Sequence, residues 1–249
     1  TTGEWNGQTF SFNNQVKDLA ELPGGKLLVA GDFTQVNGQT HVGTVLIDPA
    51  TGQIDPSWTL QARTGTNGGR VSVKSIKIIN DHIYLGGIFT HFQGNGASWT
   101  YARNGARLDI NGKPDRSWNP EFNGTVIDID VDENETYYYA AGYFTRAHNR
   151  VVENAGRLST AAGAELDQSW TFRHSYLIGK YQQTVTAANG RVYFGGSQHS
   201  LFGYNSDTMT RTSGSITMNN GGDLQASTRS ASGVVYASCH CSDFTFQDA

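Results

Sequence analysis

The stretch Lys26-Leu-Leu-Val-Ala-Gly-Asp-Phe33 decides the fold, because it recurs along the chain. It is a run of strand-forming residues that ends at a glycine corner. The further copies are His82-Ile-Tyr-Leu-Gly-Gly-Ile-Phe89, Tyr137-Tyr-Tyr-Ala-Ala-Gly-Tyr-Phe144, Arg191-Val-Tyr-Phe-Gly-Gly-Ser197 and Val234-Val-Tyr-Ala-Ser-Cys239. The corner glycines, Gly31, Gly87, Gly142 and Gly196, lie about 55 residues apart, and the fifth copy follows after a shorter interval. Self-similarity at a period of this length predicts a repeat architecture.

Two further features mark the repeats. Another apolar run precedes each copy, at Val16 to Leu22, Val73 to Ile79, Val126 to Val131, Thr184 to Ala188 and Leu224 to Ala226. A third run follows the first three copies, at Gly43 to Asp48, Gly105 to Asp109 and Gly156 to Ser159, and leads to an Asp-x-Ser-Trp pattern ending at Trp58, Trp118 and Trp170. With Gly, Asn and Asp in the connecting turns, a full repeat is expected to hold about four short antiparallel strands.

Four antiparallel strands per repeat predict the blade of a β-propeller. One blade cannot bury both of its faces, so neighbouring blades must stack on it, and the three tryptophans suit that packing. The chain shows no long helical periodicity. We therefore expect an all-β, single-domain propeller over residues 1–249. Its terminal strand is 1–13, and its blades are about 14–61, 70–122, 124–174, 182–218 and, in part, 222–249.

The two ends of the chain leave ring closure open. Residues 1–13, with Trp5 and Phe10, resemble the final strand of a blade, and the fifth copy lacks its second half. One interpretation is a five-blade ring that the N-terminal strand closes. The other, which the missing half favours, is an incomplete ring that continues into sequence beyond these residues, since an open ring exposes an unpaired edge.

The repeats resemble a known family. Units that read Leu-Pro-Gly-Gly-Lys-Leu-Leu-Val-Ala-Gly-Asp-Phe-Thr, then Val-Asn-Gly, then Ile-Asp-Pro-Ala-Thr-Gly-Gln-Ile-Asp-Pro-Ser-Trp are similar to delta-60 repeats. The resemblance covers roughly residues 16–249, is strongest over 16–176, and fades in the fourth copy, which lacks Asp-x-Ser-Trp. It implies a propeller of bacterial secreted or surface proteins, or of minor tail proteins of phages that infect actinobacteria. It supplies no catalytic motif.

Composition excludes some classes of partner. The formal net charge is −4 and the sequence pI is about 5.9, whereas nucleic-acid binding needs clustered Lys and Arg. No run of 18 apolar residues occurs, so membrane insertion is not expected. The expected partners are a host-surface glycan or protein, or other tail or surface subunits, with a homo-oligomer as a further option.

The loops after the corners are the candidate binding elements. They run from Gln35 to His41, from His91 to Tyr101 and from Arg146 to Glu153. The second loop combines His91, Phe92, Trp99 and Tyr101 with amide and hydroxyl groups, a mixture that suits sugar binding. The alternative is that these rings pack against a neighbouring blade. His91, His148 and His199 follow the corners of three copies, so we list His148 with the ligand candidates and note convergence on a metal as an alternative.

Two local clusters could carry other chemistry. Cys239 and Cys241 could form a disulfide at a bend that replaces the glycine corner, stay free thiols, or ligate a metal. Asp128, Asp130 and Asp132 resemble the start of a calcium loop, but Glu133 stands where that loop needs glycine. The alternative is a polar strand face that leads into an acidic turn. No cofactor is expected, and calcium is the one metal to consider.

The leading hypothesis is a non-enzymatic recognition or scaffold propeller, exposed on a virion tail or a bacterial cell surface. Two alternatives stay open. A secreted glycoside hydrolase or lyase would need two carboxylates in one cleft, and Glu121, Asp130 and Glu153 are the nearest candidates. A purely structural assembly subunit would need no ligand site at all.

Overall fold

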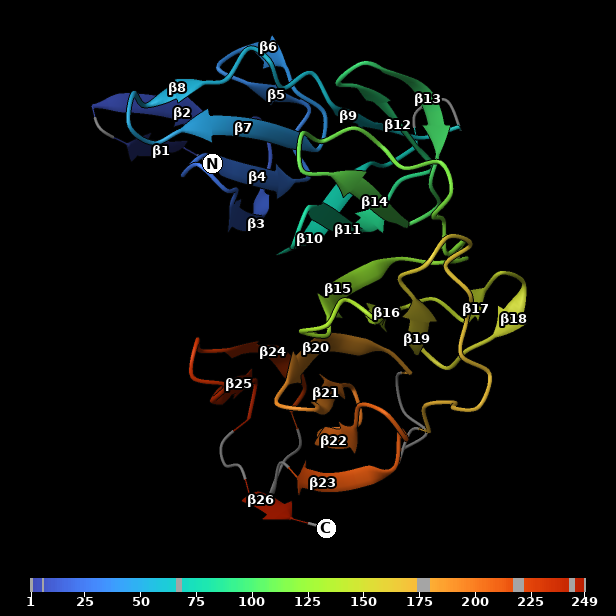
Figure 1. Cartoon of the computed structure of the whole chain (residues 1–249). Coiled ribbons are helices and arrows are strands. Elements are labelled where there is room, and N and C mark those ends of the chain that lie inside the picture. The colour runs from blue at the N-terminus through green and yellow to red at the C-terminus, as the bar shows by residue number, and fades with distance from the viewer. Residues whose placement is uncertain are drawn as a thin grey trace. The chain divides into compact units, whose positions relative to one another are not determined.

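The structure is a computed structural model that describes residues 2–5, 7–65, 69–173, 180–216, 222–241 and 245–248. The predicted terminal strand and the third, fourth and fifth predicted blades include residues outside this set, namely 1, 6, 174, 217, 218, 242–244 and 249. The chain forms two compact units, an N-terminal unit of residues 1–121 and a C-terminal unit of residues 122–249. All regular elements of the described residues are strands (Figure 1), and none of these residues forms an apolar helix that could cross a membrane.

Two main sheets build the N-terminal unit, one for each repeat. In the order of pairing, the first holds β3 (Val16–Glu21), β4 (Leu27–Gly31), β7 (Thr44–Asp48) and β8 (Gln53–Ile54). The second holds β10 (Ser72–Ile79), β11 (His82–Ile88) and β14 (Gly105–Asp109), and a single bridge from Leu108 to Pro114 takes the place of a fourth strand. Each sheet is antiparallel and follows the chain order, as expected for a propeller blade.

The C-terminal unit repeats this arrangement. Its first sheet holds β15 (Val126–Val131), β16 (Tyr137–Gly142) and β19 (Ala155–Ser159), with a bridge from Leu158 to Leu166. The next holds β20 (Gln182–Ala188), β21 (Arg191–Gly196), β22 (Leu201–Asn205), β23 (Arg211–Ile216) and β26 (Thr245–Asp248). The last pairs β24 (Leu224–Arg229) with β25 (Val235–Cys239). The predicted inner runs and corners therefore coincide with observed strand pairs.

The corner glycines are needed because two backbone segments meet there. A Cβ atom on Gly31, Gly87 or Gly142 would lie 2.1 to 2.2 Å from a backbone carbonyl oxygen, that of Gln15, Ser72 or Thr125 respectively, and one on Gly196 would lie 2.6 Å from that of Tyr181. Each of these carbonyls lies at the start of the strand with which the corner strand pairs: Ser72 is the first residue of β10, and the other three directly precede β3, β15 and β20. The close approach is therefore the same in four repeats, and it explains why this position is glycine.

The segments that follow the corners, interpreted as loops from the sequence, form hairpins. They pair β5 (Gln35–Val36) with β6 (Gln39–Thr40), β12 (His91–Gly94) with β13 (Ala97–Tyr101), and β17 (Arg146–Ala147) with β18 (Arg150–Val151). Each turn has two successive residues with positive φ, at Asn37–Gly38, Asn95–Gly96 and His148–Asn149. Such two-residue turns match the twist of the flanking strands, and Asn-Gly is their usual sequence.

The N-terminal segment also forms a hairpin, in which β1 (Thr2–Trp5) pairs with β2 (Gln8–Ser11). Phe10 and Phe12 are buried in a cluster with Phe33 and Val36. The side-chain oxygen of Asn13 then accepts hydrogen bonds from the N–H groups of Thr34 and Gln35. In the C-terminal unit, Asn123 holds Thr145 and Arg146 in the same way, so the segment that ends at Asn13 repeats an internal element of the chain.

Candidate ligand-binding surface

The hairpin of the second repeat differs from its two counterparts in length. Ten positions separate the paired residues His91 and Tyr101, against five in each of the pairs Gln35–Thr40 and Arg146–Val151. The longer hairpin also gains a third strand, because β12 pairs on its other side with β9 (Gln61–Arg63) (Figure 1). Insertions of this kind on a constant framework are typical places for binding residues.

Alternation along β12 and β13 separates the four aromatic candidates of this hairpin. Phe92 is fully buried and packs edge-on against Phe89, with ring centroids 4.7 Å apart. His91, Trp99 and Tyr101 lie on the opposite face, where the ring of His91 is 5.1 Å from Trp99 and 5.3 Å from Tyr101. We call these three residues the aromatic face. Phe92 is a core residue, so its inclusion among the ligand candidates is corrected and the alternative of ring packing holds for it.

The aromatic face is open to solvent. Trp99 is 50% exposed and Tyr101 is 44% exposed, whereas most other large aromatic residues of this unit are buried. Single exposed apolar side chains are ordinary on a protein surface, but a contiguous group marks an interaction site. An imidazole and two broad rings beside one another offer a flat apolar platform with polar edges.

The turn of this hairpin is firmly anchored, which keeps the aromatic face in place. The side chain of Asn95 accepts a hydrogen bond from the Thr59 N–H at 2.7 Å and donates to the Asn111 carbonyl at 3.1 Å. Gly94 has a φ of 118°, and a Cβ there would lie 2.2 Å from the Thr59 carbonyl oxygen. The hairpin therefore packs directly on the backbone of Thr59 and Leu60, which precede β9.

The other histidine candidates have local structural contacts. His148 is the first residue of its turn, with a φ of 46°, and its Nε2 lies 3.0 Å from the Ala164 carbonyl oxygen. The Nε2 atom of His199 lies 3.6 Å from a carboxylate oxygen of Asp223. Among the described residues no group of three or more His, Cys, Asp or Glu side chains could hold a metal. His148 is thus not part of the aromatic face.

The three Asp-x-Ser-Trp segments form one recurrent turn. In each, one carboxylate oxygen of the aspartate (Asp55, Asp115 or Asp167) accepts from both the N–H and the hydroxyl of the serine two residues later, at 2.7 to 2.9 Å. A basic side chain binds the other oxygen, from Lys26, Arg107 or Arg157 respectively. These carboxylates therefore have a structural role, as turn residues and ion-pair partners.

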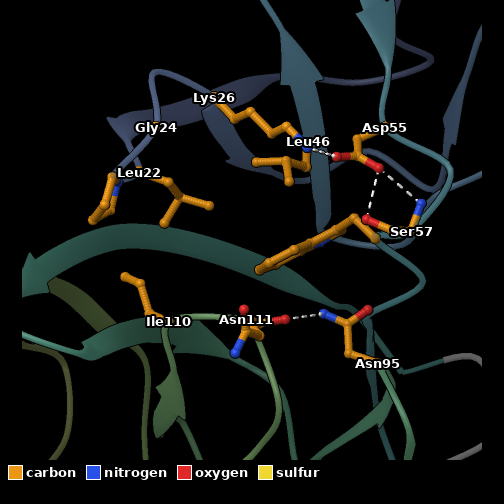
Figure 2. A pocket seen from close by; sticks show the side chains of 11 residues that line it. Leu22, Gly24, Lys26, Leu46, Asp55, Ser57, Asn95, Ile110 and Asn111 are labelled. Atoms are coloured by element: carbon orange, nitrogen blue, oxygen red, sulfur yellow. Dashed lines mark hydrogen bonds and ion pairs between the residues drawn. The ribbon is translucent and has the colours of Figure 1, made fainter.

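A pocket of about 570 Å³ lies beside the first of these turns. Figure 2 shows Lys26 reaching toward Asp55 and Asn95 toward Asn111, with Leu22, Leu46 and Ile110 around the opening. Leu46 is the counterpart of Arg107 and Arg157 in the next two repeats. In all three repeats, the backbone carbonyl at this position accepts a hydrogen bond from the N–H of the turn aspartate. The pocket thus lies where the other repeats place an arginine, and its polar side chains already bind one another.

The ion pair at this pocket predicts a pH dependence. The bond from Lys26 and the bonds from Ser57 lower the pKa of Asp55 to about 2. The pKa of an unfolded aspartate is about 4, so the pair stabilises the fold above that pH and the stabilisation is lost as the pH falls toward about 2. We expect Lys26→Gln to lower the urea midpoint more at about pH 7 than at about pH 3. Lys113→Gln, which removes the same charge from an exposed turn, is the control, and an equal loss at both pH values would contradict the assignment.

The three aspartates considered for calcium accept hydrogen bonds from backbone N–H groups. Asp128 accepts from the Val185 N–H at 2.9 Å, and Asp130 accepts from the Ala187 N–H at 2.7 Å, so both bind the next repeat. Asp132 accepts from the N–H groups of Thr136 and Tyr137 in its own turn. In the first two repeats, Asp18 binds the Ile76 N–H in the same manner as Asp128. Asp18, Asp128 and Asp130 thus join neighbouring repeats, whereas Asp132 stabilises its own turn.

Cys239 and Cys241 are joined as a disulfide. Cys239 lies opposite Leu224 in the strand pairing. The corner glycines of the other four repeats hold the same place, opposite Val16, Val73, Val126 and Gln182. The glycine of the close approach lies instead on the opposite segment, where a Cβ on Gly222 would lie 1.9 Å from the His240 carbonyl oxygen. The disulfide therefore occupies the corner of the fifth repeat.

Comparisons with known proteins agree on the fold. A family model described as a domain of unknown function (DUF5122) β-propeller matches residues 22–57. Among solved structures, the β-propeller domain of Cps50 (Swd1) from Myceliophteria thermophila is similar, with a TM-score of 0.61 and 11% sequence identity over 93% of this chain. The chain spans 65% of the length of that solved chain. No curated protein gives a significant match.

The repeated antiparallel sheets and this structural likeness define the chain as an all-β protein with a β-propeller fold. The prediction of fold class is therefore confirmed. A propeller of this kind is compatible with a binding or scaffold role, and at 11% identity the likeness to the solved domain extends to the fold alone.

Proposed function

We propose that the protein is a non-enzymatic recognition propeller that binds a carbohydrate through the aromatic face. The observation that carries the proposal is the exposed group of His91, Trp99 and Tyr101 on the longest of the three hairpins that follow the corners. Aromatic rings stack on the apolar faces of sugars, and the polar edges of His and Tyr can bond to hydroxyl groups. The anchored turn at Asn95 limits the conformational cost of binding.

We further propose that the protein acts outside the cell, as a delta-60 repeat propeller of a virion tail or a bacterial cell surface. The resemblance of the repeats supports this location. The Cys239–Cys241 disulfide also supports it, since disulfides persist in oxidising surroundings. In that setting the rigid sheets present the hairpin to a glycan on a host or neighbouring cell.

The test is a glycan array probed with the wild-type chain and with a Trp99→Ala, Tyr101→Ala variant. We expect the variant to lose about tenfold or more in affinity, because each stacked ring contributes roughly 0.5–1.5 kcal/mol beyond its buried area. Its melting temperature should be unchanged, since both rings are exposed. Tyr236→Ala, which removes a 59% exposed ring from the C-terminal unit, is the matched control.

Two results would refute the proposal. One is a blank array together with no binding to intact actinobacterial cells. The other is a variant that binds the array as tightly as the wild type, which would place the ligand site elsewhere and leave the aromatic face without a role.

A further inference from the structure

An arginine extends the aromatic face across the sheet. Arg63 on β9 pairs with His91 on β12, and His91 pairs in turn with Tyr101 on β13. Directly paired residues of antiparallel strands point to the same side of the sheet, with Cβ atoms about 5 Å apart. Arg63, His91 and Tyr101 therefore form one row over three strands, and Gln61 and Gln93 form the next row.

The guanidinium of Arg63 is available for a ligand. Within the part of the chain that the structure describes, it takes part in no hydrogen bond or ion pair, and the side chain is partly exposed. Three other arginines of the same unit have side-chain partners. Arg70 binds Asp32 at 3.1 Å and Arg107 binds Asp115 at 2.9 Å. Arg116 binds the Ser98 hydroxyl at 2.6 Å. Among the described residues no carboxylate forms an ion pair with Arg63 beside the aromatic face.

We infer that the ligand is an acidic glycan, whose sugar rings lie on Trp99 and Tyr101 while a carboxylate, sulfate or phosphate group binds Arg63. This inference rests on the proposed function and specifies its ligand. The planar guanidinium fork matches such anions with two parallel hydrogen bonds, and the bonds are stronger than those between neutral groups. The chain carries a net charge of −4, so the surface as a whole repels anions. Binding of an anion therefore depends on the local positive charge of Arg63.

Single-stranded nucleic acid could use the same kinds of group, since bases stack on aromatic rings and phosphates bind arginine. A groove for nucleic acid also needs a track of basic residues along the backbone. The paired rows of the face supply one arginine with two glutamines, a histidine and a tyrosine. The arrangement therefore favours a ligand with spaced single charges over a continuous polyanion.

The experiment compares matched ligands and matched variants. The probes are hexuronic acid oligosaccharides, the same oligosaccharides after reduction of their carboxyl groups, sulfated and phosphorylated oligosaccharides, and a single-stranded oligonucleotide. The proteins are the wild type, Arg63→Gln and Arg63→Lys. Arg191→Gln, which removes an exposed arginine from the C-terminal unit, controls for the change of charge.

We expect the wild type to bind at least one acidic class about tenfold or more tightly than the neutral counterpart, because hydrogen bonds to charged groups are stronger than those between neutral groups. The preference should weaken as salt is added. Arg63→Gln should lose both the preference and its salt dependence but keep the weaker neutral binding. Arg63→Lys should fall between, and Arg191→Gln should match the wild type.

The outcomes separate this inference from the proposed function. Equal binding of acidic and neutral glycans, or an undiminished preference in Arg63→Gln, overturns the acidic ligand and leaves carbohydrate binding standing. Absence of all glycan binding overturns both. Tighter binding of the oligonucleotide than of any glycan overturns the inference in favour of nucleic acid.

Discussion

Replacing Trp118 with alanine is expected to lower the free energy of unfolding by about 3–5 kcal/mol, the range for deleting a fully buried large aromatic side chain. Trp118 has no exposed surface, its ring meets Tyr84 edge-on at 5.4 Å, and the Arg107 guanidinium lies 6.0 Å from its centre. Removal of the indole leaves a cavity that these two side chains cannot fill. Such a loss is a large part of the roughly 5–15 kcal/mol that stabilises a typical domain.

The three equivalent tryptophans differ in burial, so their alanine variants test whether the loss of stability follows burial. Trp58 is 4% exposed and Trp170 is partly exposed, although all three tryptophans end the same turn. Urea unfolding should therefore rank the alanine variants with Trp118 the most damaging, then Trp58, then Trp170. Trp99→Ala should change stability by less than about 0.5 kcal/mol, as expected at an exposed site. A Trp170 variant less stable than the Trp118 variant would contradict the link between burial and stability.

Replacing Gly87 with alanine should cost about 3 kcal/mol, toward the upper end for overpacked sites. The added methyl group would lie 2.1 Å from the Ser72 carbonyl oxygen and 3.1 Å from the Val73 Cα. Since both are backbone atoms, relief requires β10 and β11 to move apart at the point where they are paired. The expected result is a lower melting temperature and a lower urea midpoint.

Gly65→Ala is the matched control for this prediction. Gly65 lies in the same unit, has no positive φ, and its added Cβ would approach nothing closer than 3.6 Å. There alanine should be neutral or slightly stabilising, because it reduces the conformational freedom of the unfolded chain. If both variants lost equal stability, the close approach at the corner would not be the reason for the glycine.

Much of the fold could be predicted because its signals are local and repeated. Apolar runs of strand length, the glycine corners and the tryptophan turns each recur, and the structure places a strand pair, a close backbone approach or a turn at those positions. The hairpins were missed although the Asn37–Gly38 and Asn95–Gly96 pairs are strong hairpin signals. Attention to these turns would have assigned Phe92 to the core by alternation.

The remaining features depend on partners far away in the sequence. Asp128 and Asp130 were expected on one strand face. Their role as hydrogen-bond acceptors becomes clear only from the fold, which places the N–H groups of Val185 and Ala187 beside them. Arg63 gave no signal of its own, since its place next to His91 follows from the pairing of β9 with β12. Sequence periodicity identifies strands, but not which strands become neighbours across a long connection.

The three hairpins that follow the corners are each closed by an equivalent backbone hydrogen bond at their ends, so one hairpin could replace another. The carbonyls of Thr34, Thr90 and Thr145 accept, each at 3.0 Å, from the N–H groups of His41, Ala102 and Val152 respectively. Between these fixed ends the segment can lengthen without disturbing the sheets beneath it. Because the end contacts are the same, residues 91–101 could be grafted between Thr34 and His41 to give a propeller with two copies of the longer hairpin.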